Sequence, residues 1–134
     1  MKEFSIEQQL EMFAEGNHEK IMAYIAEYHF SVDGEIAFIK RGDHSEIMKY
    51  MSICAFYDKA LVTLIERGNH TEIMSYISRS SVPAVAEIAL IKRGDPEEIS
   101  AYINKYTLSK RGEKALITRG NQSEIDTYKK HSKC

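Results

Sequence analysis

Four arginines recur at one place in a repeating sequence, and together they could bind an anion. These repeat arginines are Arg41, Arg67, Arg93 and Arg119. Side chains about one repeat apart, roughly 10 Å, could contact a phosphate backbone or an acidic peptide. A glutamate follows each arginine after five residues, as Glu46 follows Arg41. We interpret the arginines as members of ion pairs, because the glutamates cancel most of their field, and keep the anion-binding surface as the alternative.

Three histidines recur in the same way and raise the question of a metal site. They are His18, His44 and His70. The ligands of one metal ion must all lie within about 2.1 Å of it. Side chains about 10 Å apart cannot meet that condition. We therefore expect no metal site and interpret the histidines as surface residues at the starts of helices.

One tyrosine per repeat could in principle stack against nucleic-acid bases. The five are Tyr24, Tyr50, Tyr76, Tyr102 and Tyr128. Each has apolar neighbours at helical spacing, as Tyr50 has Ile47 and Met51. This pattern favours a ring buried between repeats with its hydroxyl at a polar edge.

Motifs for catalysis are absent from the sequence. It contains no HExxH, no glycine-rich phosphate loop and no CxxC pair, and no nucleophile motif surrounds a serine, threonine or cysteine. Two cysteines form no disulfide framework. Cys54 lies on an apolar helical stripe and is expected to be buried, whereas Cys134 is expected to be exposed. We expect no catalytic residue, no cofactor and no enzymatic activity.

Glycines at a constant spacing of 26 residues mark the elements that position these side chains. They stand at positions 16, 42, 68, 94 and 120, and each is followed by Asn or Asp. A glycine after an apolar-periodic segment is typical of a helix end, and an arginine in the last turn complements the helix dipole. Asn or Asp followed three residues later by Glu is typical of an N-cap and its N3 partner. One helix therefore ends at each glycine, and the next begins about two residues later.

The repeat predicts an all-α solenoid of about five 26-residue helix-turn-helix units, forming one domain over residues 1–134. A small residue within four of the five helices that precede a glycine, such as Gly34 or Ala60, would let neighbouring helices approach closely, whereas the first has Gln8 there. Polar residues in the terminal units, such as Glu11 and Lys129, are expected to act as caps. The predicted helices cover about residues 5–15, 18–29, 31–41, 44–54, 56–67, 70–79, 83–93, 96–106, 109–119 and 122–131.

Composition narrows the function classes further. The net charge of −2 favours neither nucleic acid nor an anionic membrane as a partner. No apolar run approaches the roughly 18 residues of a membrane span, and the N-terminus lacks the apolar stretch of a signal peptide. We therefore expect a cytoplasmic protein.

Stacked pairs of short helices resemble the HEAT, armadillo and tetratricopeptide solenoids, although their units of about 33 to 47 residues are longer. The resemblance implies a scaffold that binds other macromolecules along an extended surface. We expect a non-enzymatic helical-repeat scaffold that mediates protein–protein interaction. Nucleic-acid binding through the repeat arginines is the first alternative. A HEAT-like enzyme with an unrecognised carboxylate site is the second.

A particular partner is best recognised by positions that differ between repeats. These positions lie between the end of the helix that follows one repeat glycine and the start of the helix that leads to the next. Their charge changes along the sequence, from acidic near Glu27 to basic near Lys110. Aromatic and arginine side chains dominate binding hot spots. The predicted partner-binding residues are Tyr28, His29, Tyr57, Arg79 and Tyr106. A protein or peptide partner is expected, and the oligomeric state is left open.

Overall fold

The computed structural model describes residues 5–132, and in that range the chain forms ten α-helices and no strand. They are α1 (Ile6–Glu15), α2 (His18–Glu27), α3 (Val32–Arg41), α4 (His44–Ile53), α5 (Asp58–Arg67), α6 (His70–Arg79), α7 (Ala84–Arg93), α8 (Pro96–Lys105), α9 (Lys110–Arg119) and α10 (Gln122–Ser132). The all-helical repeat predicted from the sequence is confirmed, with each helix close to its predicted range.

The ends of the helices are fixed by the predicted glycines and caps. All five repeat glycines adopt left-handed backbone with φ between 70° and 79°, a conformation that costs a glycine little. The Asn17 side chain accepts a hydrogen bond from the Lys20 amide, and Asp43 does the same for Glu46. Each such cap satisfies an amide that the first turn of a helix leaves free. The glycines therefore mark the ends of α1, α3, α5, α7 and α9, and the Asn and Asp caps mark the starts of the helices that follow them.

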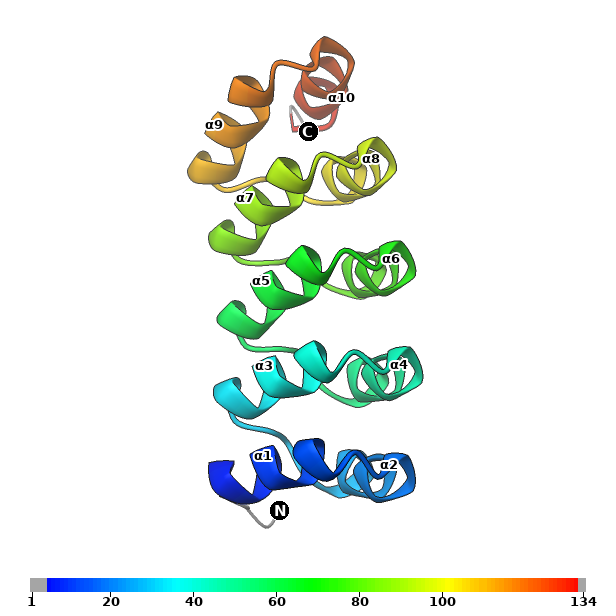
Figure 1. Cartoon of the computed structure of the whole chain (residues 1–134). Helices are drawn as coiled ribbons and strands as arrows, with labels where there is room; N and C mark the ends of the chain where they lie inside the picture. Colours follow the sequence, from blue (N-terminus) through cyan, green and yellow to red (C-terminus); the bar gives the residue numbers. More distant parts are fainter. Residues whose placement is uncertain (1–4, 133–134) are drawn as a thin grey trace. The chain divides into compact units, whose positions relative to one another are not determined.

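The chain divides within α5 into two compact units, Met1–Thr63 and Leu64–Cys134. In the first unit α1 packs against α3, and α2 packs against α4. In the second unit α7 packs against α9, while α8 packs against both α6 and α10. Within each unit, the helices that precede a repeat glycine form one layer and the helices that follow it form the other (Figure 1).

The core of each unit lies between its two layers. In the first unit the Phe30 ring stacks on Tyr50 at a centroid distance of 5.1 Å, with Phe38 against both rings. In the second unit Leu90 and Tyr102 are almost fully buried. The predicted burial of the recurring tyrosines is confirmed for four of them, whereas Tyr24 is only half-buried. The buried tyrosines are Tyr50, Tyr76, Tyr102 and Tyr128.

A side-chain oxygen from the same layer of the preceding repeat, on α1 or α7, fills the space beside two of the small residues. A Cβ atom at Gly34 would lie 1.7 Å from Gln9 Oε1, and one at Gly112 would lie 2.5 Å from Glu87 Oε1. Gln9 Oε1 also accepts hydrogen bonds from the amide and hydroxyl of Ser31. Glycine at these sites therefore makes room for a buried polar contact between repeats.

Two further sequence expectations concern exposure and membrane spans. Cys54 is half-buried rather than buried, because it is the C-cap residue of α4, where the chain leaves the apolar layer. Cys134 lies outside the described residues. Between residues 5 and 132, none of the helices has the length and apolar character needed to cross a membrane.

Candidate interaction surface

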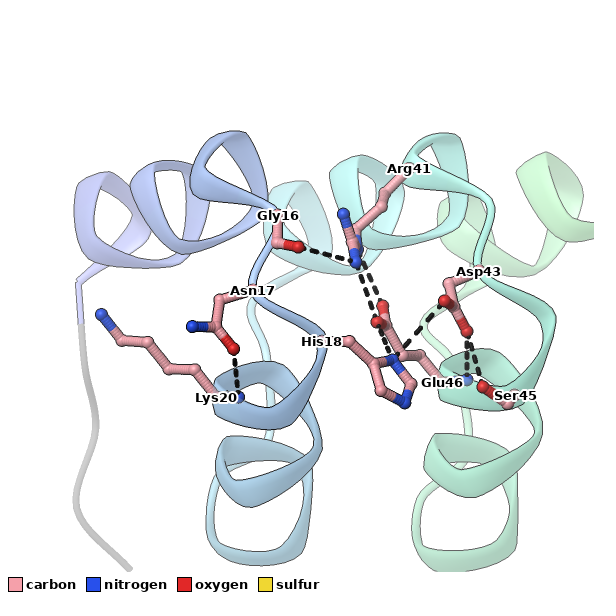
Figure 2. Close-up of polar contacts among 8 residues, drawn as sticks. All are labelled: Gly16, Asn17, His18, Lys20, Arg41, Asp43, Ser45 and Glu46. Carbon is pink, nitrogen blue, oxygen red and sulfur yellow. Dashed lines mark hydrogen bonds and ion pairs between the residues drawn. The ribbon is translucent and has the colours of Figure 1, made fainter.

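The repeat arginines are held in ion pairs. Arg41 donates from Nε to Glu46 Oε1 at 2.8 Å and from Nη2 to Oε2 at 3.0 Å, and this bond raises the pKa of Arg41 (Figure 2). Its Nη2 atom also lies 3.4 Å from the carbonyl oxygen of Gly16 in the preceding repeat. The equivalent pairs are Arg67–Glu72, Arg93–Glu98 and Arg119–Glu124. The ion-pair interpretation is confirmed, and the glutamates that balance the arginine charges have side chains that are almost completely buried.

Two of the recurring histidines also contact these glutamates. His18 Nδ1 lies 2.6 Å from Glu46 Oε2, as Figure 2 shows, and His70 Nδ1 lies 2.7 Å from Glu98 Oε2. The hydrogen bond to Glu98 raises the pKa of His70. The prediction that these histidines are only surface residues at helix starts is therefore incomplete, because each also bonds to a glutamate of the next repeat. The sequence signal was the constant spacing of 28 residues from histidine to glutamate, which a comparison of histidines with one another misses.

Each of these histidines also lies 3.5 Å from the aspartate that caps the corresponding helix of the next repeat, α4 or α8. The two resulting clusters offer one nitrogen and two carboxylate oxygens within 4.8 Å of one another, a donor set that divalent metals accept. The glutamate oxygens already accept two bonds from an arginine, whose positive charge disfavours a nearby cation. The clusters are better explained as hydrogen-bonded ion pairs. They are His18–Asp43–Glu46 and His70–Asp95–Glu98.

A buried carboxylate that the sequence analysis did not single out lies beneath the first unit's loops. Glu35 accepts a 2.6 Å hydrogen bond from the Tyr50 hydroxyl and a 2.8 Å bond from the Tyr57 amide. The Tyr50 hydroxyl in turn accepts from the Phe30 amide. Burial raises the pKa of Glu35. Both carboxylate oxygens are engaged and the side chain is fully buried, so the geometry favours a structural role over the predicted alternative of a hidden catalytic carboxylate.

Three of the predicted partner-binding residues belong to the first unit. Tyr57 is 49% exposed, and the His29 ring meets it edge-on at 5.2 Å. Tyr28 is half-buried and stacks on Tyr24 at 5.1 Å. The fold therefore brings His29 and Tyr57 together as an accessible pair.

The other two predicted residues belong to the second unit. Arg79 is exposed at the end of α6. The Tyr106 hydroxyl donates a 3.0 Å hydrogen bond to the carbonyl oxygen of Ile77, and the Lys105 ammonium lies 5.5 Å from the centre of its ring. Tyr106 thus has a packing role between α6 and α8, which leaves Arg79 as the more accessible of the two.

A groove of about 580 Å³ between α7 and α9 is the feature that the sequence analysis missed. Its apolar lining includes Ile88, Ile91 and Ala115. Lys92, Arg111 and Lys114 also line it, and all three are exposed. Arg119, which lines the groove as well, is held by Glu124. The basic segment at Lys110 and Arg111 was a partial signal, but the sequence did not show that apolar side chains lie beside it.

Comparison with protein-family models, with curated proteins and with solved structures found no match to this chain. The class is therefore defined by the fold itself, an all-α helical-repeat protein with a 26-residue unit.

Proposed function

We propose that this chain is a non-enzymatic helical-repeat scaffold that binds a protein or peptide partner, in the manner of the HEAT, armadillo and tetratricopeptide solenoids that it resembles. One observation carries the proposal. Large apolar side chains are exposed at positions that differ between repeats, as at Ile53, Tyr57 and Val85. Aromatic side chains such as Tyr57 are enriched among the residues that dominate protein binding sites.

The chemistry of the recurring residues supports the same proposal. Arginine, histidine, tyrosine and glutamate side chains that recur make bonds within and between repeats, as in Arg41–Glu46 and Tyr50–Glu35. Those residues are therefore committed to the fold, which leaves the variable positions to recognise a partner. A cytoplasmic location is part of the proposal and fits the unpaired thiol of Cys54.

Site-specific photo-crosslinking in an extract of the source cells tests this function. A photoreactive phenylalanine analogue replaces Tyr57 in one variant and Val85 in another, and a third variant carries it at the exposed Ser123 as a control. We expect a discrete protein adduct from position 57 or 85 that Ser123 does not give, and the recovered partner should bind the purified chain in calorimetry. Identical adducts from all three positions, or none, would contradict the proposal.

The alternative function is nucleic-acid binding through the repeat arginines. A gel-shift experiment tests this alternative. Contacts to phosphates must weaken steeply as salt rises. Because each repeat arginine already has a buried glutamate as partner, we expect no shifted band with single- or double-stranded oligonucleotides at low salt. A shifted band that salt abolishes would favour the alternative.

A further inference from the structure

The groove between α7 and α9 combines an apolar floor with unpaired positive charge. Within residues 5–132, no acidic side chain pairs with Lys92, Arg111 or Lys114. The repeat arginines, in contrast, have glutamate partners, as Arg119 has Glu124. The three cations therefore remain available to an external acidic group, and Ile88 and Ile91 offer an apolar surface between them.

The positive charge of Lys114 is found at its repeat position only in α9. The repeat position of Lys114 is apolar and partly exposed in three earlier helices of the same kind, where it is Ile36, Val62 and Ile88. The repeat position of Arg111 varies in charge, since it holds Asp33, Lys59 and Val85 in the earlier repeats. The fold accommodates an apolar residue in place of Lys114 three times, so it does not require a lysine there. The positive charge of Lys114 is therefore not needed for folding, and it changes the charge of the surface that α7 and α9 form together.

We infer that this groove binds an acidic amphipathic helix of a partner protein, an inference that rests on the proposed function. Apolar side chains of the helix would lie on Ile88, Ile91 and Ala115, and flanking Asp or Glu side chains would meet Lys92 and Lys114. Charge complementarity identifies the occupant, since apolar burial alone would not select acidic residues.

The geometry of the groove favours a helix over an extended strand or a nucleic acid. Its lining residues belong to two helices, whose backbone groups are already paired, so it presents no edge to which a strand could add. The ridges of a third helix fit the groove between two packed helices. None of the lining residues is aromatic, so bases would find no stacking partner.

Fluorescence anisotropy with a labelled synthetic peptide tests the inference. The probe is a helical peptide of about 16 residues with leucines along one stripe and glutamates on both sides of it. A peptide of the same composition with the leucine stripe scrambled is its control. We expect the full chain to bind the striped peptide at least about tenfold more tightly than the scrambled one, because only the stripe can cover the groove floor.

Two charge-reversed variants locate the binding site. Lys92→Glu with Lys114→Glu reverses the groove, whereas Lys110→Glu with Lys130→Glu makes the same change in net charge at exposed sites that do not line it. We expect the groove variant to lose affinity by about tenfold or more and the control to stay within about threefold of the unmodified chain. A peptide with lysines in place of the glutamates should bind the groove variant better than the unmodified chain.

Three outcomes of the peptide experiments would overturn the inference. The first is the absence of striped-peptide binding at concentrations up to about 1 mM. The second is an equal loss of affinity in the two charge-reversed variants. The third is displacement of the peptide by a single-stranded oligonucleotide whose binding Lys92→Glu with Lys114→Glu abolishes. If the crosslinked partner binds that variant as well as the unmodified chain, the inference fails while the proposed function stands.

Discussion

His70 reaches from the first turn of α6 to Glu98 in the first turn of α8, with 2.7 Å between Nδ1 and Oε2. Glu98 is fully buried, and Arg93 holds it from the other side. One carboxylate thus joins a histidine from the preceding repeat to the arginine at the end of α7.

The His70–Glu98 contact should make stability depend on pH. The hydrogen bond to Glu98, with the nearby charges of Asp95 and Glu97, raises the pKa of His70 above its ordinary value of 6.5. The stabilisation of the folded state by protonated His70 is therefore complete below about pH 6.5, and it is lost as pH rises through the folded-state pKa. We expect His70→Gln to lower the melting temperature more at pH 5.5 than at pH 8.5. Equal effects at both pH values would show that protonated His70 does not stabilise the fold.

Arg93 should contribute far more to stability than its neighbour Lys92. Removing the guanidinium takes away the permanent positive charge and the two hydrogen bonds that Arg93 gives to the buried Glu98 carboxylate, so we expect Arg93→Ala to lower the free energy of unfolding by about 2–4 kcal/mol. Lys92 is exposed, and Lys92→Ala should change the free energy of unfolding by less than about 0.5 kcal/mol. Urea denaturation measures both. Similar values for the two variants would contradict a structural role for the ion pair.

Gly68 should tolerate substitution less well than Gly120, although both adopt positive φ. Valine at either site meets the left-handed backbone, at a cost of about 1–3 kcal/mol. A Cβ atom at Gly68 would also lie 2.8 Å from Arg93 Nη1, whereas at Gly120 the nearest atom is the Thr118 carbonyl oxygen at 3.9 Å. We expect Gly68→Val to cost about 1 kcal/mol more than Gly120→Val in thermal denaturation. Equal losses would mean that the guanidinium moves aside freely.

The Tyr50 hydroxyl should contribute more to the free energy of unfolding than the Tyr57 hydroxyl does. Tyr50→Phe removes a donor to Glu35 and an acceptor of the Phe30 amide, both buried, and should cost about 1–3 kcal/mol of unfolding free energy. Tyr57→Phe changes a half-exposed side chain and should cost less than about 0.5 kcal/mol. Chemical denaturation followed by circular dichroism compares them. A Tyr50→Phe protein as stable as the Tyr57→Phe protein would refute the buried network.

The elements and the Arg–Glu pairs could be predicted because they depend on near neighbours in the sequence. A cap such as Asn17 acts on an amide three residues away, and Arg41 meets Glu46 across one short turn. The contact between His18 and Glu46 could not be predicted in the same way. The recurring spacing of 28 residues marks the pair as a candidate, but the contact itself depends on the rise and rotation from one repeat to the next, which the sequence does not state.

The candidate groove was beyond sequence reasoning for a related reason. Ile88 and Lys114 occupy the same position in successive repeats. The sequence does not show whether a side chain at this position packs against the neighbouring helix or faces solvent. Their neighbourhood becomes visible only when α7 and α9 lie side by side. The exposure of His29 and Tyr57 could be predicted because each lies just before the start of a helix, where exposure is common, whereas their role in binding stays a prediction.

The fixed sequence separation of the bonds between repeats has a consequence for folding kinetics. Arg41 and Glu46 are 5 residues apart, Tyr50 and Glu35 are 15 apart, and His18 and Glu46 are 28 apart. None of these separations grows when whole repeats are added, so each new unit closes loops of the same length and contact order falls as the chain lengthens. Duplication of any 26-residue block would therefore preserve every pairing, whereas insertion of half a block would place caps opposite helix ends. Growth by whole units is the route of expansion that this bonding scheme allows.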